Sequence, residues 1–91
     1  MSIIERIRQR IRDREYFMSS HAEEEMAEDA FERPDVENAI LHGAVDRKLT
    51  RDSRGTRYRI EGPALDGRWM HVICRFRETG DLIIITVYAK E

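Results

Sequence analysis

The sequence predicts an α+β fold in which N-terminal helices pack on one face of a four-stranded antiparallel sheet. Apolar residues recur at helical spacing up to about residue 43 and alternate with polar ones from Ala44 onward. Charge is sorted in the same way: residues 16–46 carry nine acids and one base, whereas residues 47–77 carry nine bases and three acids. We therefore expect a cationic sheet beside an anionic helical layer.

Length and composition are those of one soluble domain. We divide the 91 residues into an amphipathic N-terminal helix over residues 1–15 and an α+β core over residues 16–89. No apolar run approaches the about 20 residues of a membrane span, and no secretory segment follows Met1. The single cysteine, Cys74, has no partner for an internal disulfide. We expect a cytoplasmic location and no membrane partner.

Three helices are expected before residue 44. Isoleucines at positions 3, 4, 7 and 11 give the first helix an apolar stripe, and we interpret its arginine-rich faces as solvated, although a basic face can also bind membrane or nucleic acid. Residues 20–23 have the spacing of a capping box, which predicts Ser20 as the cap of a second helix beginning near His21. Pro34 suits the first turn of a third helix, and Gly43 suits its C′ position.

Four strands are expected after residue 44, at 45–50, 57–62, 68–77 and 82–89. The first two flank a turn at 52–55, and the last two are joined by residues 78–81, so each pair is predicted to be adjacent. In the third strand, Met70, Val72, Cys74 and Phe76 form the core face, which predicts a buried and inert thiol. In the fourth strand, Ile83, Ile85 and Val87 form a β-branched face, opposite to Leu82, Ile84, Thr86 and Tyr88.

The other face of the predicted sheet gathers the groups that RNA chemistry needs. Aligning the second, third and fourth strands places arginines, an imidazole, a hydroxyl and a phenol together. These residues are Arg57, Arg59, His71, Arg75, Thr86 and Tyr88. Arginine can hold phosphate in a bidentate manner, and histidine titrates near neutral pH. An arginine-rich exposed strand is also typical of a plain solvated surface, so the pattern alone leaves both interpretations open.

His21 is a second candidate for acid–base chemistry. The positive end of a helix disfavours protonated imidazole, which would leave a neutral base or ligand; the alternative is a capping-region histidine bonded to the sheet. With Glu24 or Glu25 it could offer two metal ligands, but such a pair lacks a third partner in the sequence. We therefore predict no metal site and no cofactor. His42, next to Gly43, is interpreted as a helix C-terminal cap.

Several segments resemble the bacterial domain-of-unknown-function family 4258. They are residues 17–22 with Met26, residues 35–36 and 39–40, residues 58–63, the turn at 66–68, and residues 85–88. The resemblance covers roughly residues 16–89, although Arg33 stands before Pro34 where family members tend to have a small capping residue. It implies a fold similar to the RelE and ParE toxins, in which a sheet face carries the catalytic groups.

Two functions from different classes follow from these observations. The first is a RelE-like, toxin-type ribonuclease that acts without metal, with His21 or His71 as base or acid and Tyr88 or Thr86 positioning the substrate. In this ribonuclease, Arg57, Arg59 and Arg75 would bind phosphate. The second is a non-catalytic module that uses the same face to bind RNA or an acidic protein, such as an antitoxin-like partner. The sequence leaves the oligomeric state open.

Overall fold

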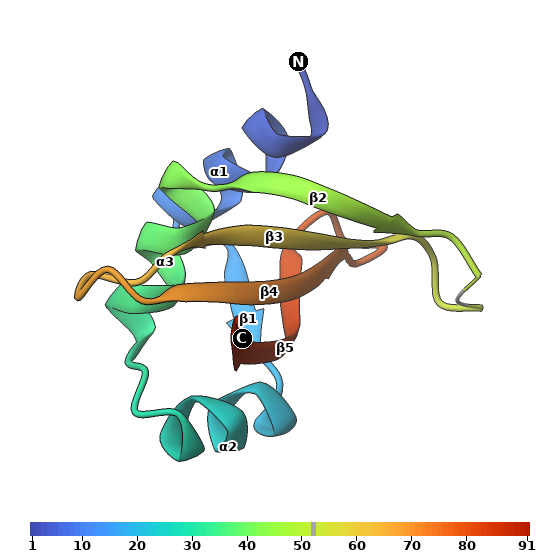
Figure 1. Ribbon diagram of the computed structural model, residues 1–91. Helices are drawn as coiled ribbons and strands as arrows, with labels where there is room; N and C mark the ends of the chain where they lie inside the picture. The colour runs from blue at the N-terminus through green and yellow to red at the C-terminus, as the bar shows by residue number, and fades with distance from the viewer. Residues whose placement is uncertain (52) are drawn as a thin grey trace.

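The computed structural model describes residues 1–51 and 53–91. Within them the chain forms α1 (Ile3–Arg12), β1 (Tyr16–Met18), α2 (Ser20–Glu28), α3 (Arg33–His42), β2 (Ala44–Leu49), β3 (Arg57–Pro63), β4 (Trp69–Phe76) and β5 (Leu82–Ala89) (Figure 1). The predicted turn at 52–55 includes Asp52, which lies outside the described residues. The longest described helices have ten residues, so none of them is long enough to cross a membrane.

The sheet has five strands of mixed direction, in the order β1-β5-β4-β3-β2. The last four strands form antiparallel pairs, whereas β1 runs parallel to β5, with Tyr16 opposite Leu82 and Met18 opposite Ile84. The prediction of a four-stranded antiparallel, RelE-like sheet preceded by all the helices is therefore wrong. β1 escaped prediction because three residues are too few to show the alternation of a strand.

The hydrophobic core lies between the sheet and the helices. Its fully buried side chains include Ile7 of α1, Val36 and Ile40 of α3, and Ile60 and Val72 of the sheet. This confirms that the isoleucine stripe of α1 packs inward. The basic side of α1 is not simply solvated, because Arg8 donates hydrogen bonds to the carbonyls of Ile40 and Gly43 at the end of α3. A cation is favourable at that negative helix end.

Two glycines allow α3 to lie directly on β3. A Cβ added to Gly62 would overlap the backbone of Ala39, and one added to Gly43 would overlap the carbonyl oxygen of Glu61. Gly43 ends α3 with an extended backbone (φ −97°, ψ −162°) instead of the left-handed C′ conformation that the sequence suggested. It is a glycine because of this close approach and not because of its φ angle.

The cap of α2 lies one residue before the predicted one. Ser19, and not Ser20, is the N-cap: its hydroxyl accepts from the Ala22 N–H (3.0 Å) and donates to the Ile85 carbonyl (2.8 Å). The same side chain thus satisfies an orphan helix amide and ties α2 to β5. At α3 the missing small cap is replaced by Glu32, whose N–H donates to Asp35 Oδ2 (2.8 Å).

Helix α2 covers the part of the β5 edge that β1 does not reach. Glu25 Oε1 accepts from the Val87 N–H and Asp29 Oδ2 from the Ala89 N–H, both at 3.0 Å. In Figure 1, α2 lies apart from α1 and α3, next to the end of β5. Side-chain carboxylates of a helix therefore satisfy strand amides that would otherwise form an open edge.

A bulge changes which residues of β5 face the core. Ile73 pairs with Thr86 but Cys74 pairs with Ile84, so β5 carries one extra residue at this point. Leu82 and Ile84 are fully buried as a result, and the prediction of Ile83 and Ile85 on the face of Val87 is wrong. C-terminal to the bulge, Val87 faces the core as the alternation requires.

Candidate functional site on the open face of the sheet

The sheet surface opposite the buried side chains of β3 and β4 carries the candidate site, and we call it the open face. Three neighbouring strands contribute to it in register: Glu61 of β3 is opposite His71 of β4, and His71 is opposite Tyr88 of β5. Side chains of adjacent strands at paired positions lie close enough to interact. The register therefore gathers three polar groups at one level of the sheet.

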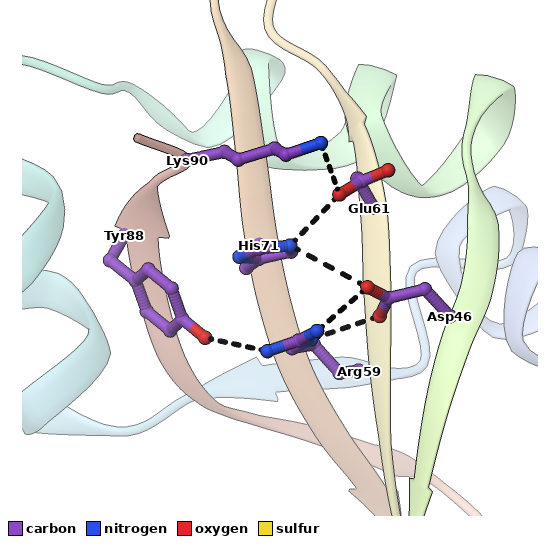
Figure 2. Close-up of polar contacts among 6 residues, drawn as sticks. All are labelled: Asp46, Arg59, Glu61, His71, Tyr88 and Lys90. Carbon is purple, nitrogen blue, oxygen red and sulfur yellow. Dashed lines mark hydrogen bonds and ion pairs between the residues drawn. The ribbon is translucent and has the colours of Figure 1, made fainter.

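His71 is the centre of this group (Figure 2). Its Nε2 lies 3.1 Å from Glu61 Oε1 and 3.6 Å from Asp46 Oδ2, and its ring meets the Tyr88 ring edge-on with centroids 5.1 Å apart. The residue is only 8% exposed although it lies outside the hydrophobic core. Two carboxylates and the Tyr88 ring thus surround it on this face of the sheet.

Asp46 reaches the site because β2 is bulged. Val45 pairs with Ile60 and Arg47 pairs with Arg59, which leaves Asp46 as the additional residue between them. Its two carboxylate oxygens accept from Arg59 Nε and Nη2 at 2.9 and 2.8 Å, and Arg59 Nη1 lies 3.5 Å from the Tyr88 hydroxyl. The bulge directs this carboxylate onto the open face, a common use of β-bulges.

The electrostatics of the cluster determine how its protons are placed. Hydrogen bonds from Arg59 lower the pKa of Asp46, and hydrogen bonds from Lys90 and then His71 lower the pKa of Glu61. The Asp46 carboxylate in turn raises the pKa of Arg59. Both carboxylates are therefore ionised at neutral pH and can only accept, so His71 Nε2 is the nitrogen that carries a proton. Among the residues that the structure describes, the buried Nδ1 of His71 has no hydrogen-bond partner.

Three side chains of the cluster also have the chemistry of metal ligands. One ligand atom from each of Asp46, Glu61 and His71 lies within 4.8 Å of the others. Each carboxylate already pairs with a cationic side chain, since Arg59 holds Asp46 at 2.8 Å and Lys90 Nζ lies 2.9 Å from Glu61. A metal ion would have to displace these two cations, so the arrangement favours an ion-pair network.

An open pocket of about 460 Å³ gives access to the cluster. It is lined by Arg59, His71, Tyr88, Ala89 and Lys90, and by the acidic residues Asp29 and Glu91. Two cations, an imidazole and a phenol therefore share one space with two carboxylates. Such a set can bind an anion and move protons on it.

The structure places the remaining predicted site residues at greater distances along the sheet. Thr86 is opposite Ile73, two residues along the strands from the pair of His71 and Tyr88. Arg75 is opposite Ile83 and lines a separate pocket of about 490 Å³ with Arg54 and Arg77. Arg57 lines a further pocket beside Arg51, near the β2–β3 connection. Of the predicted arginines, only Arg59 belongs to the His71 cluster. Arg57 and Arg75 belong to what we call the cationic end of the sheet, which also contains Arg51, Arg54 and Arg77.

The other two histidines and the cysteine lie elsewhere. His21 projects from α2 with 63% of its side chain exposed, and it pairs with Glu25 one turn later at 3.1 Å. His42 Nδ1 lies 3.1 Å from the Asn38 carbonyl of its own helix. Cys74 is fully buried, and burial raises the pKa of its thiol to about 12, which confirms the predicted core position.

Three members of the cluster were not chosen from the sequence. Alternation along β3 puts Glu61 on the same face as Arg59, but a carboxylate in a basic strand looks like a solvated residue. Lys90 follows the last strand, where periodicity ends. Asp46 shows no sequence signal, since simple alternation through β2 ignores the bulge that brings it to the open face.

Comparison with known proteins identifies the family of this domain. The model of the family described as "Domain of unknown function (DUF4258)" matches residues 18–89. The chain belongs to the DUF4258 family. Helix α1 and Lys90 lie outside the DUF4258 match, whereas Asp46, Glu61 and His71 lie within it. No curated protein and no solved structure matches the chain.

Proposed function

We propose that this protein binds single-stranded RNA on the open face and cleaves it without a metal ion. The observation that carries the proposal is the shared pocket, in which Arg59, His71, Tyr88 and Lys90 face the same space. Phosphoester cleavage needs positive charge at the phosphate and groups that accept and donate protons, and these four side chains are of the required types.

The reaction is attack of the ribose 2′-hydroxyl on the adjacent phosphorus. The new O–P bond closes a 2′,3′-cyclic phosphate while the bond to the 5′-oxygen breaks. His71 takes the proton of the attacking hydroxyl on Nδ1, which has no partner among the described residues and which the bound RNA must uncover, while its Nε2–H stays bonded to Glu61. The Tyr88 phenol gives its proton to the leaving 5′-oxygen. Arg59, whose Nη1 lies 3.5 Å from that phenol, stabilises the phenolate, and Lys90 neutralises the phosphate.

The cationic end of the sheet supplies the path for the rest of the strand. Arg57 and Arg75 lie beyond the His71 cluster, in pockets that also contain Arg51, Arg54 and Arg77. Phosphates bound there would contribute affinity that falls steeply with salt, because counterions are released on binding. Replacing Arg75 with glutamine should flatten the salt dependence, whereas the same change at the exposed Arg12 of α1 should leave it unchanged.

The activity would make the protein a toxin-type ribonuclease, with an antitoxin-like protein as the partner that restrains it. The test is incubation of the purified chain with a single-stranded RNA in EDTA, with the product ends identified. We expect 2′,3′-cyclic phosphate and 5′-hydroxyl ends, and no cutting of the same RNA with 2′-O-methyl groups. Cleavage that appears only after a divalent ion is added would overturn the metal-free mechanism.

Two further outcomes assign a different role to the open face. RNA that binds but stays whole, both in EDTA and in a separate assay with divalent ions, would contradict catalysis. The protein would then be a non-catalytic RNA-binding module. If the protein has no affinity for RNA at low salt, the RNA proposal fails as a whole. An acidic protein would then be the natural partner of the cationic end of the sheet.

A further inference from the structure

A second pocket, of about 560 Å³, adjoins the His71 pocket on the open face. Trp69 forms one wall, Glu61 and Gly67 line it, and it shares Ala89 and Lys90 with the His71 pocket. The Lys90 ammonium lies at the boundary between them, 2.9 Å from Glu61. A chain molecule in one pocket can therefore continue directly into the other.

Trp69 presents an aromatic surface at this position. It is the first residue of β4, two residues before His71 and on the same face, and it remains 50% exposed. Its carbonyl accepts from the Lys90 N–H at 2.9 Å, which fixes the backbone of Lys90 next to the indole. A large apolar side chain left this exposed beside a polar cluster is typical of a binding surface.

The turn that precedes Trp69 is held in place by several contacts. Arg68 donates to Asp66 Oδ2 at 2.8 Å and to the carbonyls of Asp29 and Ala30 at 2.7 and 3.0 Å, and its guanidinium lies over the Phe31 ring. These bonds hold the 64–68 turn against the end of α2 in the unbound protein. The pocket is therefore formed before any ligand enters, which lowers the entropic cost of binding.

Glu61 adds a hydrogen-bond acceptor to the apolar wall. Among the described residues, its ion pairs with His71 and Lys90 both use Oε1. Oε2 is thus available to accept from an N–H group of a ligand lying on the indole. An aromatic surface with one carboxylate acceptor at its edge and a cation beyond it matches an unpaired nucleobase followed by its phosphate.

We propose that this pocket is a nucleobase subsite, in which the base next to the cleaved phosphate stacks on Trp69 and donates a hydrogen bond to Glu61. The inference rests on the proposed function, because it places one nucleotide of the same RNA. It predicts selectivity for single strands, because a base that is paired and stacked in a duplex cannot also stack on Trp69.

The only tryptophan of the chain makes the test direct, since all indole fluorescence comes from Trp69. The probes are a 2′-O-methyl single strand, which cannot be cut, the same strand with abasic positions, and its duplex. We expect the single strand to quench Trp69, and the abasic strand and the duplex to bind without quenching. Trp69→Leu should weaken single-strand binding about tenfold or more in an anisotropy assay, with abasic binding unchanged.

Trp69→Phe provides the matched control, because it keeps an aromatic ring at this exposed position and should leave both affinities close to those of the wild type. Equal affinity of single and abasic strands, with no effect of Trp69→Leu, would overturn the subsite while RNA cleavage in EDTA still supports the proposed function. Quenching by the single strand without any cleavage would overturn the ribonuclease and leave the subsite in place. Absence of binding to every probe would overturn both.

Discussion

The two faces of the sheet bury their residues by different means. On the core face, Ile60, Val72 and Val87 are fully buried in the hydrophobic core that the sheet forms with the helices. On the open face, His71 is 8% exposed because Glu61, Asp46 and Tyr88 surround it. Apolar burial stabilises the fold whatever the pH, whereas a partly buried ionic cluster adds little stability. The difference indicates that the first face maintains the structure and the second carries the chemistry.

The largest difference should appear when isoleucines of the two faces are truncated. Ile60 is fully buried on the core face of β3, whereas Ile73 is half-buried on the open face of β4. Ile60→Ala should lower the free energy of unfolding by about 2–5 kcal/mol, because it removes buried methyl groups and leaves a cavity. Ile73→Ala should cost less than half as much in urea denaturation. Equal losses would show that both faces are covered.

A smaller effect is expected where α2 is capped. Ser19→Ala should lower the free energy of unfolding by about 1 kcal/mol, since it removes the acceptor for the Ala22 N–H and the bond to Ile85. Ser20→Ala, one residue inside the helix, is the matched control and should change the melting temperature little. A larger loss at Ser20 than at Ser19 would be incompatible with this cap.

The smallest effect concerns the ion pairs of the open face. Arg59 lowers the pKa of Asp46 below its ordinary value of 3.8, so the ionised carboxylate adds stability at neutral pH that is lost as the pH falls through the lower folded-state pKa. Asp46→Asn should therefore cost about 1 kcal/mol or less at neutral pH, and nothing once the pH is well below 3.8. Urea titrations across the acid range measure both. A cost that persists at low pH would assign Asp46 a role other than its charge.

Much of the β3 and β4 surface was predictable because alternation needs no knowledge of neighbouring strands. The alternation of side chains along β4 is enough to place Met70, Val72 and Cys74 in the core and His71 on the open face. The same rule gave wrong faces in β5. The bulge near Ile85 arises from the pairing with β4 and has no signature in the sequence of either strand. Strand β1 was missed because its formation depends on the distant β5.

The candidate site was predicted in part for the same reason. Arg59, His71 and Tyr88 lie together, as the alternation along their three strands predicted. His21 instead lies on α2, in a separate pair with Glu25. The two carboxylates next to His71 are positioned by the register of the strands. Glu61 is paired with His71 across β3 and β4, and the bulge of β2 brings Asp46 to the same face. Contacts set by tertiary pairing are therefore the part that the sequence pattern could not supply.

The measurement that tests the central claim most directly compares the two candidate histidines. The rate of cleavage of single-stranded RNA in EDTA should fall about a hundredfold or more in His71→Ala, the loss expected when a proton-transfer group is removed, with RNA affinity nearly unchanged. His21→Ala should cut at the wild-type rate. Because His71 is buried, Tyr88→Phe, which keeps the ring, serves as a second variant and should also slow cleavage. Loss of cleavage in His21→Ala, or undiminished cleavage in folded His71→Ala and Tyr88→Phe, would contradict the assignment of the open-face pocket as the reaction site.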